Sequence, residues 1–139
     1  MQYLWYALIA LVAYTLVAPF SKIALQEIPA DMVALVSNGM LALTALVLIV
    51  TSDKSIVSAF TSEYAPYMFA AGICLSVGII SYYRALAGGP VSIVVPVFGL
   101  FLVGSSVIGI VFLDEALTTR KGIGIMLAIV AVFLTTFEG

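Results

Sequence analysis

Residues 32–50 read MVALVSNGMLALTALVLIV, an apolar run that contains no charged side chain. An α-helix needs about 20 mostly apolar residues to cross the hydrocarbon core of a bilayer. Strands of a membrane β-barrel instead alternate apolar and polar residues over about 10 positions. Because the run is continuous rather than alternating, it predicts a transmembrane α-helix.

The composition of the whole chain agrees with this prediction. Of its 139 residues, 64% are hydrophobic and 9% are charged. A soluble domain carries roughly a quarter charged residues, and disordered chains are poor in apolar residues. The composition therefore excludes a soluble globular domain and a disordered chain, and it indicates an integral membrane protein that lies in a lipid bilayer.

The charged residues divide the chain into five apolar segments, at about residues 3–25, 32–50, 64–86, 91–113 and 118–137. Five spans use about 100 residues, whereas six would leave about 19 for all connections, which is too few. A signal peptide is the alternative for the first segment, but no Lys or Arg precedes Trp5, so we expect a retained span. We predict an all-α integral membrane protein in which residues 1–139 form one domain, a bundle of five transmembrane helices.

Two prolines, Pro19 and Pro96, lie well inside the first and fourth segments. Proline removes a backbone hydrogen bond and clashes with the preceding turn, so each is expected to kink its helix. Carbonyls that are freed in lipid need partners within the protein or in a water-lined cavity. The prolines therefore favour a transporter; irregular packing is the alternative, because proline is common in membrane helices.

The acidic residues all lie in the gaps between segments or at segment ends. This placement argues against an exchanger that uses a mid-membrane carboxylate. Lys22 and Arg84 lie just inside the ends of the first and third segments, and both of these ends reach the same face. Their long side chains either snorkel to the interface or form a site for an anionic or carboxylate-bearing solute.

Several polar residues within the segments add to this candidate site. Tyr14 and Asn38 need hydrogen-bond partners in an apolar medium, and bonding between helices is the alternative to substrate contact. Tyr82 and Tyr83 directly precede Arg84. The candidate substrate-binding residues are Lys22, Asn38, Tyr82, Tyr83, Arg84 and Tyr14.

Small residues and a pair of carboxylates mark the last two segments. Close helix packing is predicted at four small residues, Gly104, Ser105, Gly109 and Gly122. Asp114 and Glu115 precede the fifth segment, where carboxylates favour the positive end of the helix dipole. We therefore expect them to cap this helix, and a gating role for Glu115 is the alternative.

Motifs for catalysis or metal binding are missing from the sequence. The single cysteine, Cys74, excludes an intrachain disulfide and a cysteine-rich metal site, and the chain has no histidine. It contains no phosphate-binding loop and no nucleophile–base pair. We therefore expect no cofactor, no enzymatic activity and no nucleic-acid partner.

The basic residues are almost evenly divided between the two membrane faces. The N-terminal face carries Lys54, Arg120 and Lys121, and the opposite face carries Lys22 and Arg84. Such a weak bias permits insertion in both orientations, and hence an inverted pair of copies. If Lys22 and Arg84 instead face a cavity, the N-terminus is expected in the cytoplasm.

The second half of the chain carries a series of motifs in a definite order: YYRAL at 82–86, Gly89-Pro90, Pro96, LDEALT at 113–118 and Gly122. This series, with Gly72 before it, resembles the EamA-type repeat of the drug/metabolite transporter superfamily over about residues 66–137. In the first half, Lys22 fits a lysine of that family, while Ser37 and Asn38 stand where the family often has an arginine.

Most members of that superfamily hold two inverted repeats of five spans in one chain, so the resemblance implies that a single repeat pairs with a second copy. It implies an antiparallel homodimer that exports small metabolites such as amino acids by alternating access across the cytoplasmic membrane. Two alternatives are a non-transporting membrane subunit or assembly partner, and an exporter of cationic drugs like the small multidrug-resistance proteins. The missing mid-membrane acid counts against the drug exporter.

Overall fold

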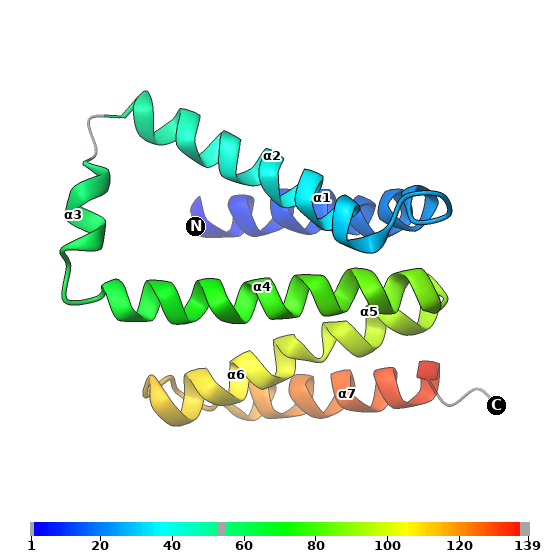
Figure 1. The fold of residues 1–139 in the computed structure, drawn as a ribbon. Helices are drawn as coiled ribbons and strands as arrows, with labels where there is room; N and C mark the ends of the chain where they lie inside the picture. Colours follow the sequence, from blue (N-terminus) through cyan, green and yellow to red (C-terminus); the bar gives the residue numbers. More distant parts are fainter. Residues whose placement is uncertain (1, 53–54, 137–139) are drawn as a thin grey trace. The chain divides into compact units, whose positions relative to one another are not determined.

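The structure, a computed structural model, describes residues 2–52 and 55–136. Over these residues the chain forms helices and no strand (Figure 1). The helices are α1 (Gln2–Ala24), α2 (Ala30–Val50), α3 (Ile56–Phe60), α4 (Ala65–Gly88), α5 (Val91–Gly99), α6 (Phe101–Phe112) and α7 (Thr119–Thr136). Within the described part of the chain, five stretches are long and apolar enough to cross a membrane, with α5 and α6 together forming one of them. The predicted all-α fold with five transmembrane helices is confirmed.

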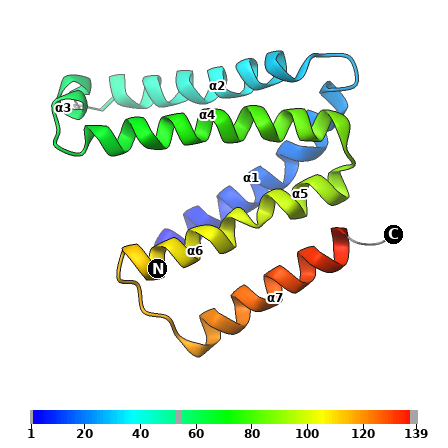
Figure 2. The same cartoon turned by 60° about the horizontal axis from the view of Figure 1, so that its bottom comes forward.

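Two compact units make up the chain, and each is described by itself. In the first unit, Met1–Gly88, α4 lies against both α2 and α1. Figure 2 shows α2 and α4 running antiparallel along each other. Val33 and Ala34 of α2 and Tyr83 of α4 form the buried cluster at this contact. Ala34 is only 2% exposed, and its small side chain lets the two backbones approach closely.

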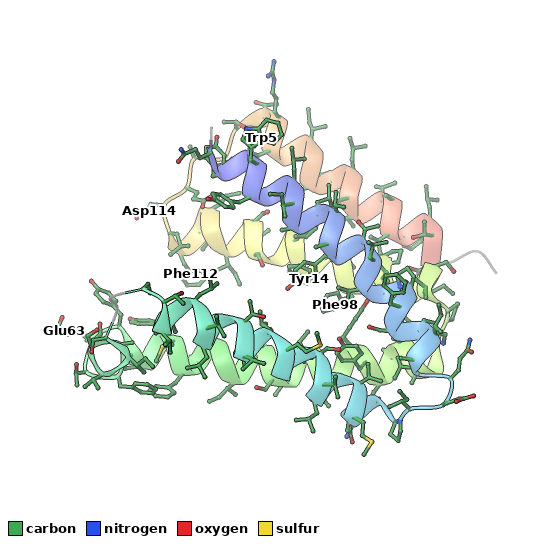
Figure 3. All side chains as sticks on the ribbon, turned by 90° about the horizontal axis from the view of Figure 1, so that it is seen from above. Trp5, Tyr14, Glu63, Phe98, Phe112 and Asp114 are labelled. Carbon is green, nitrogen blue, oxygen red and sulfur yellow. The ribbon has the colours of Figure 1, made fainter. Side chains whose placement is uncertain are left out.

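Most other large side chains of the spans point outward. Trp5 and Tyr14 on α1, for example, are 69% and 72% exposed within the chain. Both are labelled in Figure 3. In water such a surface would be costly, but lipid tails are as apolar as the side chains and cover them without penalty. The sparse burial therefore fits helices that are surrounded by lipid.

The short helix α3 joins α2 to α4 and runs across their axes (Figure 1). Its Phe60 ring lies 5.9 Å from the ring of Phe69 on α4, which ties the helix to the end of that span. Ile56 and Val57 are exposed. A crosswise apolar helix at the end of two spans has the direction that a helix on a membrane surface would take.

In the second unit, Gly89–Gly139, the span of α5 and α6 packs against α7. Pro96 lies inside α5, and the span is interrupted at Leu100, about one turn later. There the N–H of Leu100 donates to the carbonyl of Val97 at 3.2 Å. In the first unit, α1 continues unbroken through Pro19 to Ala24.

Candidate functional site

A groove of about 590 Å³ lies between α2 and α4 in the first unit. Its walls are alanine, leucine and isoleucine side chains, and its polar members are Asp31, Asn38 and Ser76. Ala34, Ala42 and Ala45 leave room along one side of α2, while Leu75, Ile79 and Ile80 form the wall on α4. The groove therefore combines apolar walls with a few polar groups, as small-molecule sites commonly do.

Two polar groups within the groove are held by their own helices. Asn38 Nδ2 donates to the carbonyl of Ala34 at 2.8 Å, and Ser76 Oγ donates to the carbonyl of Gly72 at 2.8 Å. An amide and a hydroxyl each also carry an acceptor oxygen. These hydrogen bonds position both groups without using all of their hydrogen-bonding capacity.

An ion pair lies at one end of the groove, where α2 begins and α4 approaches its end. Arg84 Nη2 lies 3.2 Å from Asp31 Oδ1 and 3.3 Å from Oδ2, and Arg84 Nε lies 3.3 Å from Oδ1. The two side chains are 65% and 64% exposed. Exposed pairs contribute only about 0–1 kcal/mol, so the guanidinium can exchange this carboxylate for another at little cost.

Lys22 binds the end of α4 rather than the groove. Its Nζ donates to the carbonyl of Leu86 at 2.7 Å and to that of Ala87 at 3.4 Å. The last carbonyls of a helix lack partners within the helix, and a cation there also favours the helix dipole. Lys22 thus fastens the end of α1 to the end of α4.

The tyrosines of the candidate site have different surroundings. Tyr83 is 3% exposed and packs on Val33 and Ala34, and Ala34 lines the groove. The ring of Tyr82 lies 5.7 Å from the ring of Tyr83, edge to face. Tyr14 lies on α1 and does not line the groove. The structure therefore places Asn38 and Asp31 in one groove, and the ion pair with Asp31 holds Arg84 at the end of this groove.

Sequence reasoning did not include Asp31 in the candidate site. The sequence contained information that points to Asp31. Because α2 and α4 are consecutive spans, the start of α2 and the end of α4 share a membrane face. Asp31 and Arg84 therefore had to lie at the same depth. The sequence did not show which helices lie side by side.

The small residues of the last two spans lie in the second unit. Among the described atoms, a Cβ at Gly104 would meet nothing within 4 Å, whereas one at Gly122 would lie 4.0 Å from Leu117 Cδ1. Gly109 is buried and faces the Glu115 carboxyl group, with its Cβ position 3.3 Å from Glu115 Cδ. Close packing at Gly104 and Ser105 stays a prediction.

The prediction that Asp114 and Glu115 cap the helix of the fifth span is wrong. The first turn of α7 contains no acidic residue, and Thr118 Oγ1 accepts a hydrogen bond from the N–H of Lys121 at 3.3 Å. The cap comes from Thr118 because α7 begins only at Thr119, several residues after Asp114 and Glu115.

Comparison with known proteins identifies the family. The family model of the EamA-like transporter family matches residues 1–137, which include all five spans. No curated protein and no solved structure matches the chain. With five helices long enough to cross a bilayer and a family match over nearly its whole length, the chain is a multi-pass membrane protein that belongs to the EamA-like transporter family.

Proposed function

We propose that the chain is one half of a homodimeric transporter that exports a small metabolite, such as an amino acid, across the cytoplasmic membrane. The observation that carries this proposal is the match to a transporter family over one set of five spans. Alternating access generally rocks one repeat against another around a central site. A second copy, inserted the other way up, would supply the second repeat.

We also propose that the two units work as one five-span domain over residues 1–139. The family match runs across the boundary at Gly88 and Gly89 without interruption. Neither the four helices of the first unit nor the three of the second correspond to the whole matched region. This supports a single functional domain.

The groove between α2 and α4 is our candidate for substrate contact. Its apolar walls suit the carbon skeleton of a small metabolite, and the Asn38 amide offers both a donor and an acceptor. The guanidinium of Arg84 presents donors in a planar arrangement that matches a carboxylate. The groove and the end of α4 would be supported by Tyr82, Tyr83 and Lys22. Tyr14 would contact the substrate from α1.

The test is uptake of radiolabelled amino acids into liposomes that contain the purified protein. Asn38→Ala is expected to lower the flux about tenfold, because a lost hydrogen bond to substrate costs about 1 to 1.5 kcal/mol. Thr44→Val is the matched control on the same helix. Its hydroxyl donates to the carbonyl of Met40 at 2.9 Å, and the residue does not line the groove.

The control variant is expected to transport like the unchanged protein. Equal flux in both variants would contradict the assignment of the groove. Absence of flux for every amino acid and every related small metabolite in the unchanged protein would contradict the transport proposal itself.

A further inference from the structure

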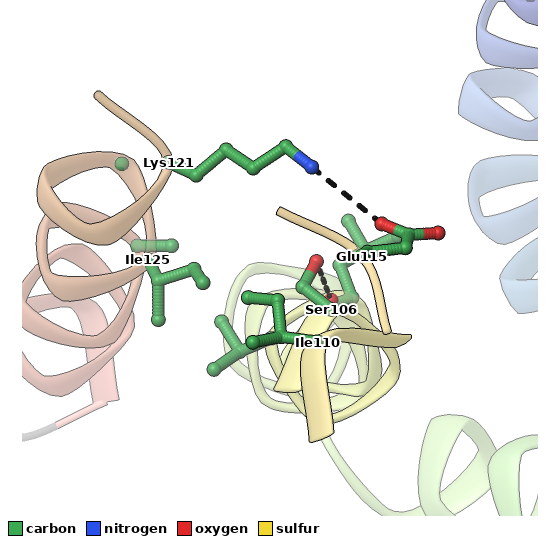
Figure 4. A pocket seen from close by; sticks show the side chains of 9 residues that line it. Ser106, Ile110, Glu115, Lys121 and Ile125 are labelled. Carbon is green, nitrogen blue, oxygen red and sulfur yellow. Dashed lines mark hydrogen bonds and ion pairs between the residues drawn. The ribbon is translucent and has the colours of Figure 1, made fainter. Parts of the chain in front are cut away.

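A second pocket, of about 310 Å³, lies between α6 and α7 in the second unit (Figure 4). Its walls are apolar, with Val103 and Ile110 from α6 and Ile125 and Ala128 from α7. Ser106 adds a hydroxyl group, which donates to the carbonyl of Leu102 at 2.8 Å. Glu115 and Lys121 are its only charged lining residues among the described ones.

The backbone holds Glu115 against the end of α6. Asp114 has a φ of 53°, in the left-handed region that aspartate tolerates better than most residues. This left-handed backbone conformation of Asp114 lets the N–H of Glu115 donate to the carbonyl of Gly109 at 3.2 Å. The carboxyl group lies over the same glycine, where a Cβ would be 3.3 Å from Glu115 Cδ. Gly109 therefore provides the space that the carboxylate occupies.

Lys121 reaches Glu115 from the first turn of α7. Its Nζ lies 3.5 Å from Glu115 Oε2, and the two side chains are 49% and 56% exposed. A dashed line marks this ion pair in Figure 4. At this exposure an ion pair contributes about 0–1 kcal/mol. A ligand with one positive and one negative group can therefore replace it without a large loss.

The position of this pair along the spans restricts what such a ligand can be. The spans Val91–Phe112 and Thr119–Thr136 end and begin beside the pair, so it lies where the hydrocarbon core gives way to lipid headgroups. The apolar walls extend from the pair along both helices. An occupant complementary to this pocket carries an apolar chain on the hydrocarbon side and two opposite charges at the interface.

We propose that this pocket binds a phospholipid whose headgroup carries a primary ammonium and a phosphate, as an ethanolamine phospholipid does. One acyl chain lies along the apolar walls, the phosphate binds Lys121, and the ammonium donates hydrogen bonds to Glu115. The quaternary ammonium of a choline lipid has no N–H to donate. The headgroup of phosphatidylglycerol has no cation for Glu115.

The experiment is native mass spectrometry of the purified protein, incubated with equal amounts of phosphatidylethanolamine, phosphatidylcholine and phosphatidylglycerol that carry identical acyl chains. We expect about tenfold more ethanolamine lipid than either other lipid to remain bound, as charge-assisted hydrogen bonds to the headgroup would give. Equal retention of the three lipids would overturn the proposal.

Two charge variants and two matched controls assign the effect to the pocket. Glu115→Gln is expected to abolish the preference for ethanolamine over choline lipid, and Lys121→Gln to weaken retention of both. Asp114→Asn and Arg120→Gln remove the same charges from neighbouring positions that do not line the pocket. Retention that changes as much in the controls as in the two pocket variants would contradict the proposal.

Gly109→Ala keeps every charge but places a methyl group 3.3 Å from Glu115 Cδ, so the carboxyl group must shift. It is expected to lower the preference for ethanolamine lipid as Glu115→Gln does, and circular dichroism checks that both variants are folded.

A variant that combines Cys74→Ser with Ser106→Cys tests whether a second copy of the chain occupies the pocket instead of a lipid. Cross-links between copies through this new cysteine would show that a second copy covers the pocket, which would overturn the proposal.

Discussion

At the scale of single residues, Lys22 and Arg84 near the candidate groove have different roles. Lys22 binds the last carbonyls of α4, which stabilises a helix end. Arg84 lies in an exposed pair with Asp31, which leaves its planar group available for exchange. Lys22 and Arg84 both lie near the end of an apolar segment, but Lys22 binds backbone carbonyls whereas Arg84 binds a carboxylate.

Replacement of Arg84 tests this difference. Arg84→Ala is expected to lower amino-acid flux in liposomes about tenfold, since a bidentate, charge-assisted contact to a substrate carboxylate is lost. Arg84→Lys keeps the charge but not the planar arrangement of donors, so an intermediate flux is expected. Normal flux in Arg84→Ala would remove Arg84 from the site.

At the scale of elements, the contact of α2 with α4 decides the shape of the groove. The helices pack together at Val33, Ala34 and Tyr83, and the groove runs along α2 and α4 from Asp31 and Ala34 onward. A small buried residue such as Ala34 at this contact serves packing in lipid, where helix association depends on van der Waals contact.

Ala34→Leu is expected to destabilise the first unit by about 1 to 3 kcal/mol, because a larger side chain does not fit a packed contact. Thermal unfolding in detergent, followed by circular dichroism, measures the change as a lower midpoint. Ala13→Leu is the control, since Ala13 lies exposed on α1. Equal midpoints for the two variants would show that the contact tolerates the extra volume.

At the scale of the whole molecule, the odd number of spans places the ends of the five-span set on opposite faces. The basic residues divide three against two between these faces, a weak bias under the positive-inside rule. Arg84 and Lys121 are well exposed at the ends of their helices, so both still count toward this balance.

Dual insertion is therefore expected and can be measured by labelling. Gln26→Cys, in the turn after α1, and Ser62→Cys, in the turn before α4, are introduced separately with Cys74 replaced by serine. Each new cysteine should react with an impermeant maleimide from both sides of the membrane. Labelling of each site from one side only would contradict the antiparallel homodimer.

Much of the fold was predictable because a bilayer imposes one simple demand on sequence, a long run of apolar residues. The site was predictable only in part. Asn38 and Arg84 stood out as polar groups within or near apolar runs, whereas Asp31 resembled an ordinary charge at the end of a span. The interruption at Leu100 lies a turn away from Pro96, whose position suggested it.

The sequence by itself determined the number, order and approximate limits of the spans, because hydrophobicity along the chain decides which segments enter lipid. Only the tertiary structure decided that Asp31 meets Arg84, that Lys22 binds the end of α4, and that Glu115 lies over Gly109 beside Lys121. These contacts depend on which helices lie side by side and how the turns direct them. An apolar run encodes its insertion but not its neighbours.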